Sequence, residues 1–70
     1  MNVFIFGSHG MAGHMIAEYF KQKKDVTVYT SSRYSSGENH YQLDVRDWKR
    51  VKEAMAEAKP DIIINCTGIL

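Results

Sequence analysis

Cysteine is almost absent from this chain, in which Cys66 is the only one among 70 residues. A single thiol cannot form an internal disulfide, and there is no second cysteine with which it could hold a metal ion. The three histidines, His9, His14 and His40, also lack the spacing of a zinc site. The sequence therefore predicts no disulfide and no metal site, and a reducing, cytoplasmic location is the default expectation.

An excess of charge of one sign is also missing. Nine lysines and arginines are balanced by eight aspartates and glutamates, which gives a formal net charge of +1. So balanced a chain produces no overall field that would indicate binding to nucleic acid or to a membrane surface. No apolar run is long enough to span a bilayer, and the apolar stretch at residues 3–6 is too short for a secretory leader. We therefore expect one small domain with neither nucleic acid nor membrane as a partner.

Glycine has no more than its ordinary share of the chain, yet three of the five glycines form one motif, Gly7-x-x-Gly10-x-x-Gly13, directly after an apolar segment. Glycines at such a junction let the backbone turn tightly and approach a pyrophosphate, and the following helix directs unpaired N–H groups at it. The spacing differs from the G-x-G-x-x-G of the best-known dinucleotide fingerprint. We predict a dinucleotide site here; the alternative is a glycine-rich turn that binds nothing.

The hydrophobic pattern switches between strand-like and helix-like periods along the chain. It predicts strands at residues 2–6, 26–30, 40–45 and 61–65. It predicts helices at residues 10–23 and 47–59, the second with Asp47 as its N-cap and an end before Pro60. The order β-α-β-β-α-β places helices where parallel strands need crossovers. We predict an α/β fold, a Rossmann-like doubly wound parallel sheet with strand order 3-2-1-4 and a ligand site at the switch between strands 1 and 4.

Apolar stripes predict which faces of these elements are buried. The first helix has a stripe made of Met11, Met15, Ile16, Tyr19 and Phe20. The second helix has a stripe made of Trp48, Val51, Met55 and Ala58. The run Ile62-Ile63-Ile64 indicates a strand that needs cover on both faces, and a chain ending at Leu70 would leave that strand as an exposed apolar edge. We therefore expect the chain to be part of a larger domain.

The end of the second strand indicates which nicotinamide dinucleotide the site takes. An NAD site usually has an aspartate or glutamate there to hold the ribose 2′-OH, whereas this strand runs into Ser31-Ser32-Arg33. The Arg33 guanidinium suits a 2′-phosphate, and Ser31 or Ser32 offers a hydroxyl donor beside it. His9, in the glycine turn, is a further candidate donor. We expect NADP(H) rather than NAD(H); the alternative is that Arg33 is a solvated loop charge and His9 a partly exposed turn residue.

Four segments of the chain resemble the extended short-chain dehydrogenase/reductase family, and within it the sugar-nucleotide reductases typified by dTDP-4-dehydrorhamnose reductase. They are residues 7–13 (GSHGMAG), Ser32-Arg33, Leu43-Asp44-Val45 and residues 60–68 (PDIIINCTG). These segments span nearly the whole chain, whereas family members are several times longer. The resemblance implies that residues 1–70 are the N-terminal NAD(P)-binding part of such a protein, without its substrate domain.

The resemblance also implies how the glycine turn holds the cofactor. The backbone of Gly10, Met11 and Ala12 is expected to meet the pyrophosphate. Gly7 and Gly13 are expected to permit the turn and the close packing of the helix.

Two further segments gain a role from the resemblance. Asp44 and Val45 are expected to flank the adenine, with the carboxylate accepting from its exocyclic amine; the alternative is that Asp44 only caps a neighbouring loop. Cys66, Thr67 and Gly68 are expected to line the wall beside the nicotinamide-side ribose. The sequence departs from its relatives there, since they commonly have Asn-Ala-Ala-Ala or Asn-Asn-Ala-Gly. Whether Thr67 adds a hydroxyl contact or is only a β-branched strand-end residue stays open.

By this resemblance the longer protein is an NADPH-dependent oxidoreductase that reduces a keto group of a nucleotide-linked deoxysugar for polysaccharide synthesis. The catalytic Tyr-x-x-x-Lys pair of relatives lies beyond residue 70, so we assign no catalytic residue. Tyr19 and Lys23 match that pattern by letters alone, and we expect Tyr19 in the core. Two alternatives stay open: an NAD-dependent sugar-nucleotide epimerase or dehydratase, and a non-catalytic module that senses NADP(H).

Overall fold

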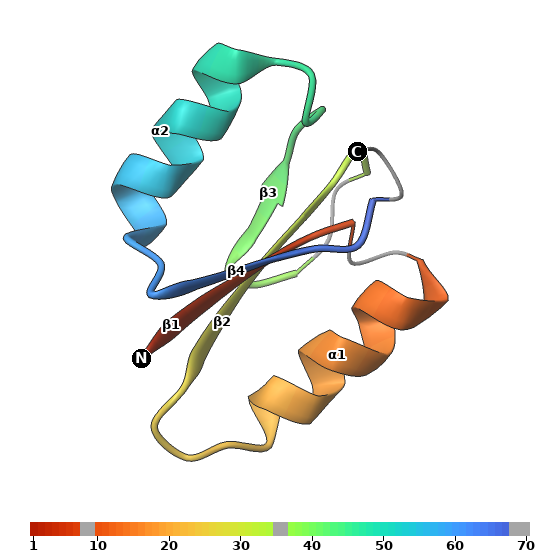
Figure 1. Cartoon of the computed structure of the whole chain (residues 1–70), viewed down its shortest axis with the longest axis vertical. Coiled ribbons are helices and arrows are strands. Elements are labelled where there is room, and N and C mark those ends of the chain that lie inside the picture. The colour runs from red at the N-terminus through yellow and green to blue at the C-terminus, as the bar shows by residue number, and fades with distance from the viewer. Residues whose placement is uncertain (8–9, 35–36, 68–70) are drawn as a thin grey trace.

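Four parallel strands form one sheet with a helix on each face (Figure 1). The structure is a computed structural model that describes residues 1–7, 10–34 and 37–67. Its elements in chain order are β1 (Asn2–Phe6), α1 (Met11–Lys21), β2 (Thr27–Ser32), β3 (His40–Gln42), α2 (Trp48–Ala58) and β4 (Ile62–Asn65). The strand order in the sheet is β3-β2-β1-β4. The predicted Rossmann-like α/β fold with order 3-2-1-4 is therefore confirmed.

The centre of the sheet is β1, whose side chains alternate between the two faces. Val3, Phe4 and Ile5 have no solvent exposure. Val3 and Ile5 pack with Ala17 of α1, whereas Phe4 and Phe6 pack on the other face, under α2. The apolar run from Val3 to Phe6 is therefore explained by helices on both sides of the sheet.

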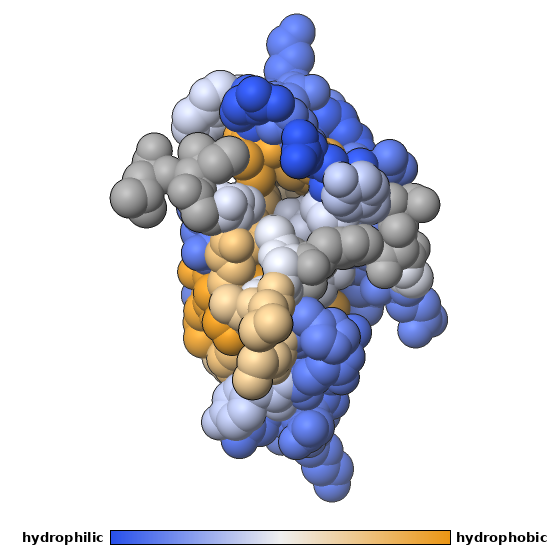
Figure 2. Space-filling model, turned by 90° about the vertical axis from the view of Figure 1, so that its right-hand side faces the viewer, coloured by the Kyte–Doolittle hydropathy of each residue, from blue (hydrophilic) through white to orange (hydrophobic). Residues whose placement is uncertain are grey.

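The predicted apolar stripe of α1 is correct for Ile16 and Phe20, which pack against the core, and wrong for its other three members. Met11 is 83% exposed and Met15 and Tyr19 are exposed too, whereas Gly13 and Ala17 face the sheet. Gly13 and Ala17 are the buried residues because α1 lies close against β1 and β2 at these positions. Figure 2 shows the apolar surface that results on this face of the molecule.

Tyr19 is also not in the core, contrary to expectation. Its ring lies on the surface of α1, edge-on to Phe20 with ring centroids 5.2 Å apart. The ammonium of Lys23 sits 4.7 Å from the centroid of the Tyr19 ring. The two residues that mimic a catalytic pair therefore form a surface cation–π contact at the C-terminal end of α1.

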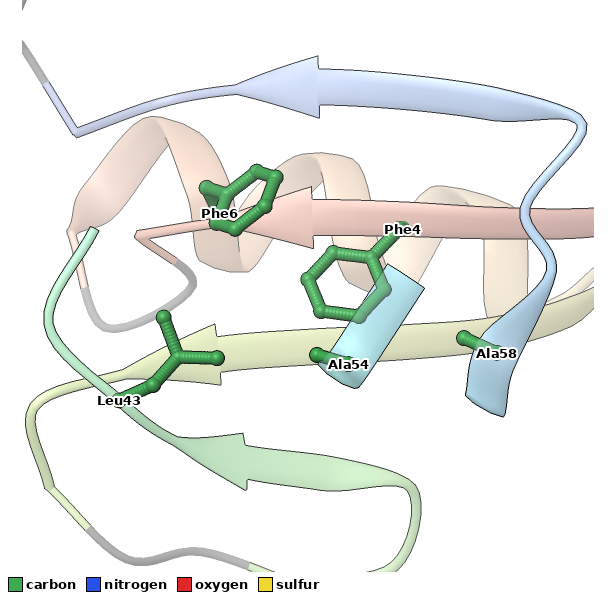
Figure 3. Packing of buried hydrophobic residues seen from close by; sticks show 5 residues of the cluster. All are labelled: Phe4, Phe6, Leu43, Ala54 and Ala58. Carbon is green, nitrogen blue, oxygen red and sulfur yellow. The ribbon is translucent and has the colours of Figure 1, made fainter. Parts of the chain in front are cut away.

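The core beneath α2 is built from two phenylalanines of β1, a leucine and two alanines. Figure 3 shows these residues, which are Phe4, Phe6, Leu43, Ala54 and Ala58. Of the predicted stripe, Ala58 is buried and Val51 and Met55 pack against the cluster. Trp48 is 74% exposed because it is the first residue of the helix, beside the Asp47 N-cap and away from the cluster. The prediction that Trp48 belongs to the buried stripe is therefore wrong.

The edge strand β4 lies beside β1 and leaves its isoleucines partly uncovered. Ile62 is 39% exposed and Ile63 is 55% exposed, while Ile64 packs on the α1 side of β1. Within the described ranges no further strand pairs with the outer edge of β4. The expectation of an exposed apolar edge therefore agrees with the structure.

Candidate functional site

A tight turn at Gly7 brings the ends of three strands together. The registers pair Phe6 with Ser31 of β2 on one side and with Asn65 of β4 on the other. The Gly7 N–H donates to the Ser31 carbonyl over 2.9 Å, and the Cys66 N–H donates to the Phe6 carbonyl over 2.9 Å. The turn therefore lies at the carboxyl edge of the sheet, at the switch between β1 and β4.

Only glycine fits at position 7. Its φ is +79°, in the left-handed region that L side chains rarely adopt. A Cβ built on Gly7 would lie 2.9 Å from the carbonyl carbon and oxygen of Cys66 and 3.0 Å from the Thr67 Cα. The backbone after β1 and the backbone after β4 thus approach each other so closely that only glycine fits at the turn, while its predicted role toward a pyrophosphate stays a prediction.

The N-terminus of α1 opens beside this turn. Gly10 is the N-cap, and its N–H donates to the Gly7 carbonyl over 3.2 Å. No hydrogen bond from a described side chain caps this end, and the first turn of α1 has no acidic residue. Because the N-terminal end of a helix is partially positive, this end favours an anion.

A cleft of about 360 Å³ lies at the carboxyl edge of the sheet, above these groups. Its wall combines the glycine turn with the segments that follow β2, β3 and β4. The lining residues are Gly7, Gly10, Ser31, Ser32, Arg33, Tyr34, Leu43, Asp44, Val45, Arg46, Cys66 and Thr67. A single cleft therefore gathers segments that are about 60 residues apart in the sequence.

Most of the predicted cofactor residues line this cleft. They are Gly7, Gly10, Ser32, Arg33, Asp44, Val45, Cys66 and Thr67. Met11 and Ala12 are exposed in the first turn of α1 and do not line the cleft. Gly13 is buried on the side of α1 that faces the sheet. His9 and Gly68 lie outside the described residues.

Three residues of the wall were not predicted: Tyr34, Leu43 and Arg46. Each is adjacent in sequence to a predicted residue, because the wall is made of short segments rather than single positions. Adjacency to Arg33 or Asp44 was the available signal, since the ends of neighbouring parallel strands lie at one edge of a sheet.

The segment after β2 is fixed by the hydroxyl of Ser32. Ser32 Oγ donates to the Tyr34 carbonyl over 2.9 Å and accepts from the Tyr34 N–H over 3.2 Å. It also lies 3.0 Å from Nε2 of His40, whose Nδ1 is 2.7 Å from Thr30 Oγ1. These bonds hold the bend that leaves Arg33 and Tyr34 exposed at the cleft. The hydroxyl predicted to assist Arg33 is therefore part of the support of the Arg33 segment.

The carboxylate of Asp44 is bound to Arg46. Oδ1 accepts from the Arg46 N–H over 2.9 Å and from Nε over 3.1 Å, and Oδ2 accepts from Nη2 over 2.8 Å. Side-chain and then backbone bonds from Arg46 lower the pKa of Asp44 from 3.8 to about 2, partial desolvation opposes this shift, and the charges of Arg46 and Arg33 add to it. The carboxyl is therefore ionised at neutral pH. Its contacts with the backbone and side chain of Arg46 are those of the alternative role, a carboxylate that caps a neighbouring loop. The adenine role stays a prediction.

The segment after β4 forms the opposite wall. Asn65 Oδ1 accepts from the Thr67 N–H over 3.0 Å and from Thr67 Oγ1 over 2.7 Å. Cys66 is half-buried and packs against the α1-side core. The Thr67 hydroxyl hydrogen thus points at Asn65, and the hydroxyl oxygen is the atom that can accept from a ligand.

The described part of the chain also bears on two other features, a metal site and a membrane-spanning helix. Residues 1–7, 10–34 and 37–67 contain no group of three or more His, Cys, Asp or Glu side chains placed to hold a metal ion. Neither α1 nor α2 is long and apolar enough to cross a membrane.

The doubly wound sheet, the glycine turn and the cleft at the strand switch define a Rossmann-like nucleotide-binding unit. A family model described as the NAD dependent epimerase/dehydratase family matches residues 3–70, and the chain belongs to this family. The family consists of enzymes that use nicotinamide dinucleotide cofactors.

One solved structure is similar over nearly the whole chain. It is the crystal structure of a hypothetical dTDP-4-dehydrorhamnose reductase from Sulfolobus tokodaii, which is 26% identical with a TM-score of 0.74. The match covers 99% of this chain and 24% of that one, so the chain spans about a quarter of its length. A search of curated proteins finds no match.

Proposed function

We propose that this chain is the cofactor-binding part of an NADPH-dependent reductase that acts on a keto group of a nucleotide-linked deoxysugar. The observation that supports it most directly is the cleft at the strand switch, built around a glycine turn that tolerates no side chain. The family match and the similarity to a hypothetical dTDP-4-dehydrorhamnose reductase support the reaction class. The single cysteine is compatible with a reducing, cytoplasmic location.

The residues of the cleft fit a dinucleotide. The Gly7 turn lets a pyrophosphate approach the backbone, and the uncapped N-terminus of α1 offers N–H groups to its charge. A volume of about 360 Å³ is at the lower end of the range for ligand sites and suits the adenosine half of the cofactor. When bound, the cofactor supplies the hydride, and the residues of this chain position it.

Each wall of the cleft has a proposed partner on the cofactor. Arg33 meets the 2′-phosphate, and Asp44 with Val45 flanks the adenine. Thr67, with Cys66, lies beside the nicotinamide-side ribose, and His9 and Gly68 belong to the same assignment. We assign no catalytic residue to this chain; the proton donor and the sugar-nucleotide site belong to the substrate part of the proposed reductase.

The preference for NADPH rests on charge at the end of β2. No acidic side chain lines the cleft at the end of β2, and Arg33 is exposed at its mouth. A guanidinium forms charge-assisted, paired hydrogen bonds with a phosphate, whereas a ribose 2′-OH offers it one neutral acceptor. NADPH should therefore bind more tightly than NADH.

Titration of the purified protein with NADPH and NADH, followed by cofactor fluorescence, tests this assignment. We expect NADPH to bind at least about tenfold more tightly than NADH, and Arg33→Gln to remove most of that difference. Arg50→Gln is the matched control, because Arg50 lies on α2 in an exposed ion pair with Glu53 and does not line the cleft. If neither NADPH nor NADH binds, the proposed function is refuted.

The family's name, NAD dependent epimerase/dehydratase, supports a second candidate, an NAD-dependent epimerase or dehydratase acting on a sugar nucleotide. It predicts tighter binding of NADH than of NADPH, and no effect of Arg33→Gln on that order. The same titration therefore separates the two candidates.

A further inference from the structure

We propose that Arg46 is a second residue that selects a cofactor with a phosphate on its adenosine ribose, acting together with Arg33. This inference depends on the proposed function, because it concerns the same dinucleotide in the same cleft. Arg46 follows β3, whereas Arg33 follows β2, and both residues line the cleft. A phosphate at the mouth of the cleft would therefore meet guanidinium groups from two neighbouring strand ends.

The Arg46 side chain is held in place by Asp44. Nε lies 3.1 Å from Oδ1 and 3.3 Å from Oδ2, and Nη2 lies 2.8 Å from Oδ2. The backbone around it is fixed as well, because the Asp47 N–H donates to the Asp44 carbonyl over 2.9 Å. A long side chain that is already ordered loses less conformational entropy when it binds a ligand. Asp44 is thus a positioning residue for Arg46.

One edge of the Arg46 guanidinium remains for a ligand. Arginine has five N–H donors, and the contacts with Asp44 use those on the Nε–Nη2 edge. The Nη1–Nη2 edge is the paired-donor geometry that binds phosphate. The side chain is 72% exposed although it lines the cleft, so this edge is accessible.

The charges of the cleft mouth match a phosphate. Arg33, Asp44 and Arg46 all line the same cleft, so the two arginines and the carboxylate are charged groups of one site. Asp44 offsets one positive charge and leaves an excess of one. A phosphate monoester has a charge of about −1.5 to −2 at neutral pH, whereas the 2′-OH of NADH has none. The cluster therefore favours the phosphorylated ribose and gains little from the hydroxyl.

The experiment compares Arg46→Gln with the unchanged protein for NADPH and NADH, and for adenosine 2′,5′-bisphosphate and ADP as probes of the adenosine end. We expect Arg46→Gln to weaken NADPH and the bisphosphate by about tenfold and NADH and ADP by less than about twofold. Arg46→Lys, which keeps the charge but not the fork, should restore part of the loss. Arg50→Gln again serves as the control on α2.

The double variant Arg33→Gln/Arg46→Gln gives a second readout. If both arginines contact one phosphate, their effects on NADPH affinity are coupled, so the double loss differs from the product of the single losses. An Arg46→Gln variant with unchanged NADPH affinity overturns the inference, and so does equal weakening of NADPH and NADH. If the unchanged protein binds neither NADPH nor NADH, or binds both only weakly, the proposed function itself is refuted, whatever the effect of Arg46→Gln. Retained NADH affinity shows that the variant is folded.

Discussion

At the scale of single residues, the site depends most on Gly7, because two separate requirements meet there. The left-handed φ of +79° and the 2.9 Å approach of the Cys66 backbone both exclude a Cβ. Gly7→Ala should lower the free energy of unfolding by about 2–4 kcal/mol, from the conformational cost and the overpacking together. Urea unfolding measured by circular dichroism gives this value.

Gly37→Ala is the matched control. The φ of Gly37 is outside the left-handed region, and an added Cβ would meet no described atom within 4 Å. Its free energy of unfolding should stay within about 0.5 kcal/mol or rise slightly. Equal losses in the two variants would show that the close approach at Gly7 is not what excludes alanine.

The contact between Asp44 and Arg46 predicts a pH dependence of stability. The pKa of Asp44 is about 2 in the folded protein and near 3.8 without partners. Since the folded value is the lower one, the stabilisation is fully present above about pH 4 and is lost as the pH falls through about 2. The contribution is small because the pair is exposed to solvent. In Arg46→Gln the Asp44 pKa, followed by NMR titration, should rise toward 3.8.

A second measurement tests the same contact in stability. The difference in free energy of unfolding between the unchanged protein and Arg46→Gln should be constant above pH 5 and disappear near pH 2. An Asp44 pKa that stays near 2 in Arg46→Gln would contradict the assigned cause, since Arg46 supplies the main bonds.

The residue types at strand ends predicted most of the residues that line this cleft. A glycine triplet and an arginine without a nearby acid have direct chemical meaning, so Gly7 and Arg33 were found from sequence. Tyr34 and Arg46 were not, because loop side chains follow no period. Their directions are fixed by local hydrogen bonds, such as those of Ser32 with Tyr34, that only the folded chain reveals.

At the scale of elements, α1 shows where periodicity fails to identify the buried face. Its large apolar residues recur at helical steps, yet the buried positions are Gly13 and Ala17, and of the large residues Ile16 and Phe20 pack against the core. Hydrophobicity scales weight large side chains, whereas the distance between helix and sheet decides which residues fit. Sequence patterns therefore located the helix and two of its packing residues, Ile16 and Phe20, but assigned the exposed methionines and Tyr19 to the same face.

Matched substitutions on α1 test this orientation. Met15→Gln should change the free energy of unfolding by less than about 0.5 kcal/mol, because Met15 is mostly exposed. Ala17→Gln should lower it by about 2–3 kcal/mol, because it introduces a large amide against β1 and β2. Both changes keep a good helix former. Larger destabilisation by Met15→Gln, measured by urea unfolding, would restore the stripe predicted from sequence.

The observed end of β2 differs from the predicted one for a related reason. The sequence predicts that the second strand ends at residue 30, since Ser31 and Ser32 have turn chemistry. Pairing with Tyr41 and Gln42 of β3 extends β2 to Ser32 instead. Hydrogen bonding across the sheet overrides local propensity there. As a result, Arg33 directly follows the end of β2 and lies at the cleft.

At the scale of the whole molecule, the cleft joins the two halves of the fold. The glycine turn and α1 belong to the first β-α unit, the Arg33 and Arg46 segments follow β2 and β3, and Thr67 follows β4. A ligand that spans this cleft contacts every strand end of the sheet. Its binding energy should therefore stabilise the cooperative fold rather than one loop.

Thermal unfolding with added cofactor tests this linkage. A ligand present at 100 times its Kd adds about 2.7 kcal/mol to the stability of a protein that binds it only when folded. For a chain of this size we expect a rise in Tm of more than about 10 °C with saturating NADPH, and a smaller rise with the same concentration of NADH. Circular dichroism and cofactor fluorescence should report the same Tm, because all strand ends share the ligand. A ligand-induced shift seen by fluorescence alone would show that NADPH orders only its local segment, and that the sheet unfolds independently of the cleft.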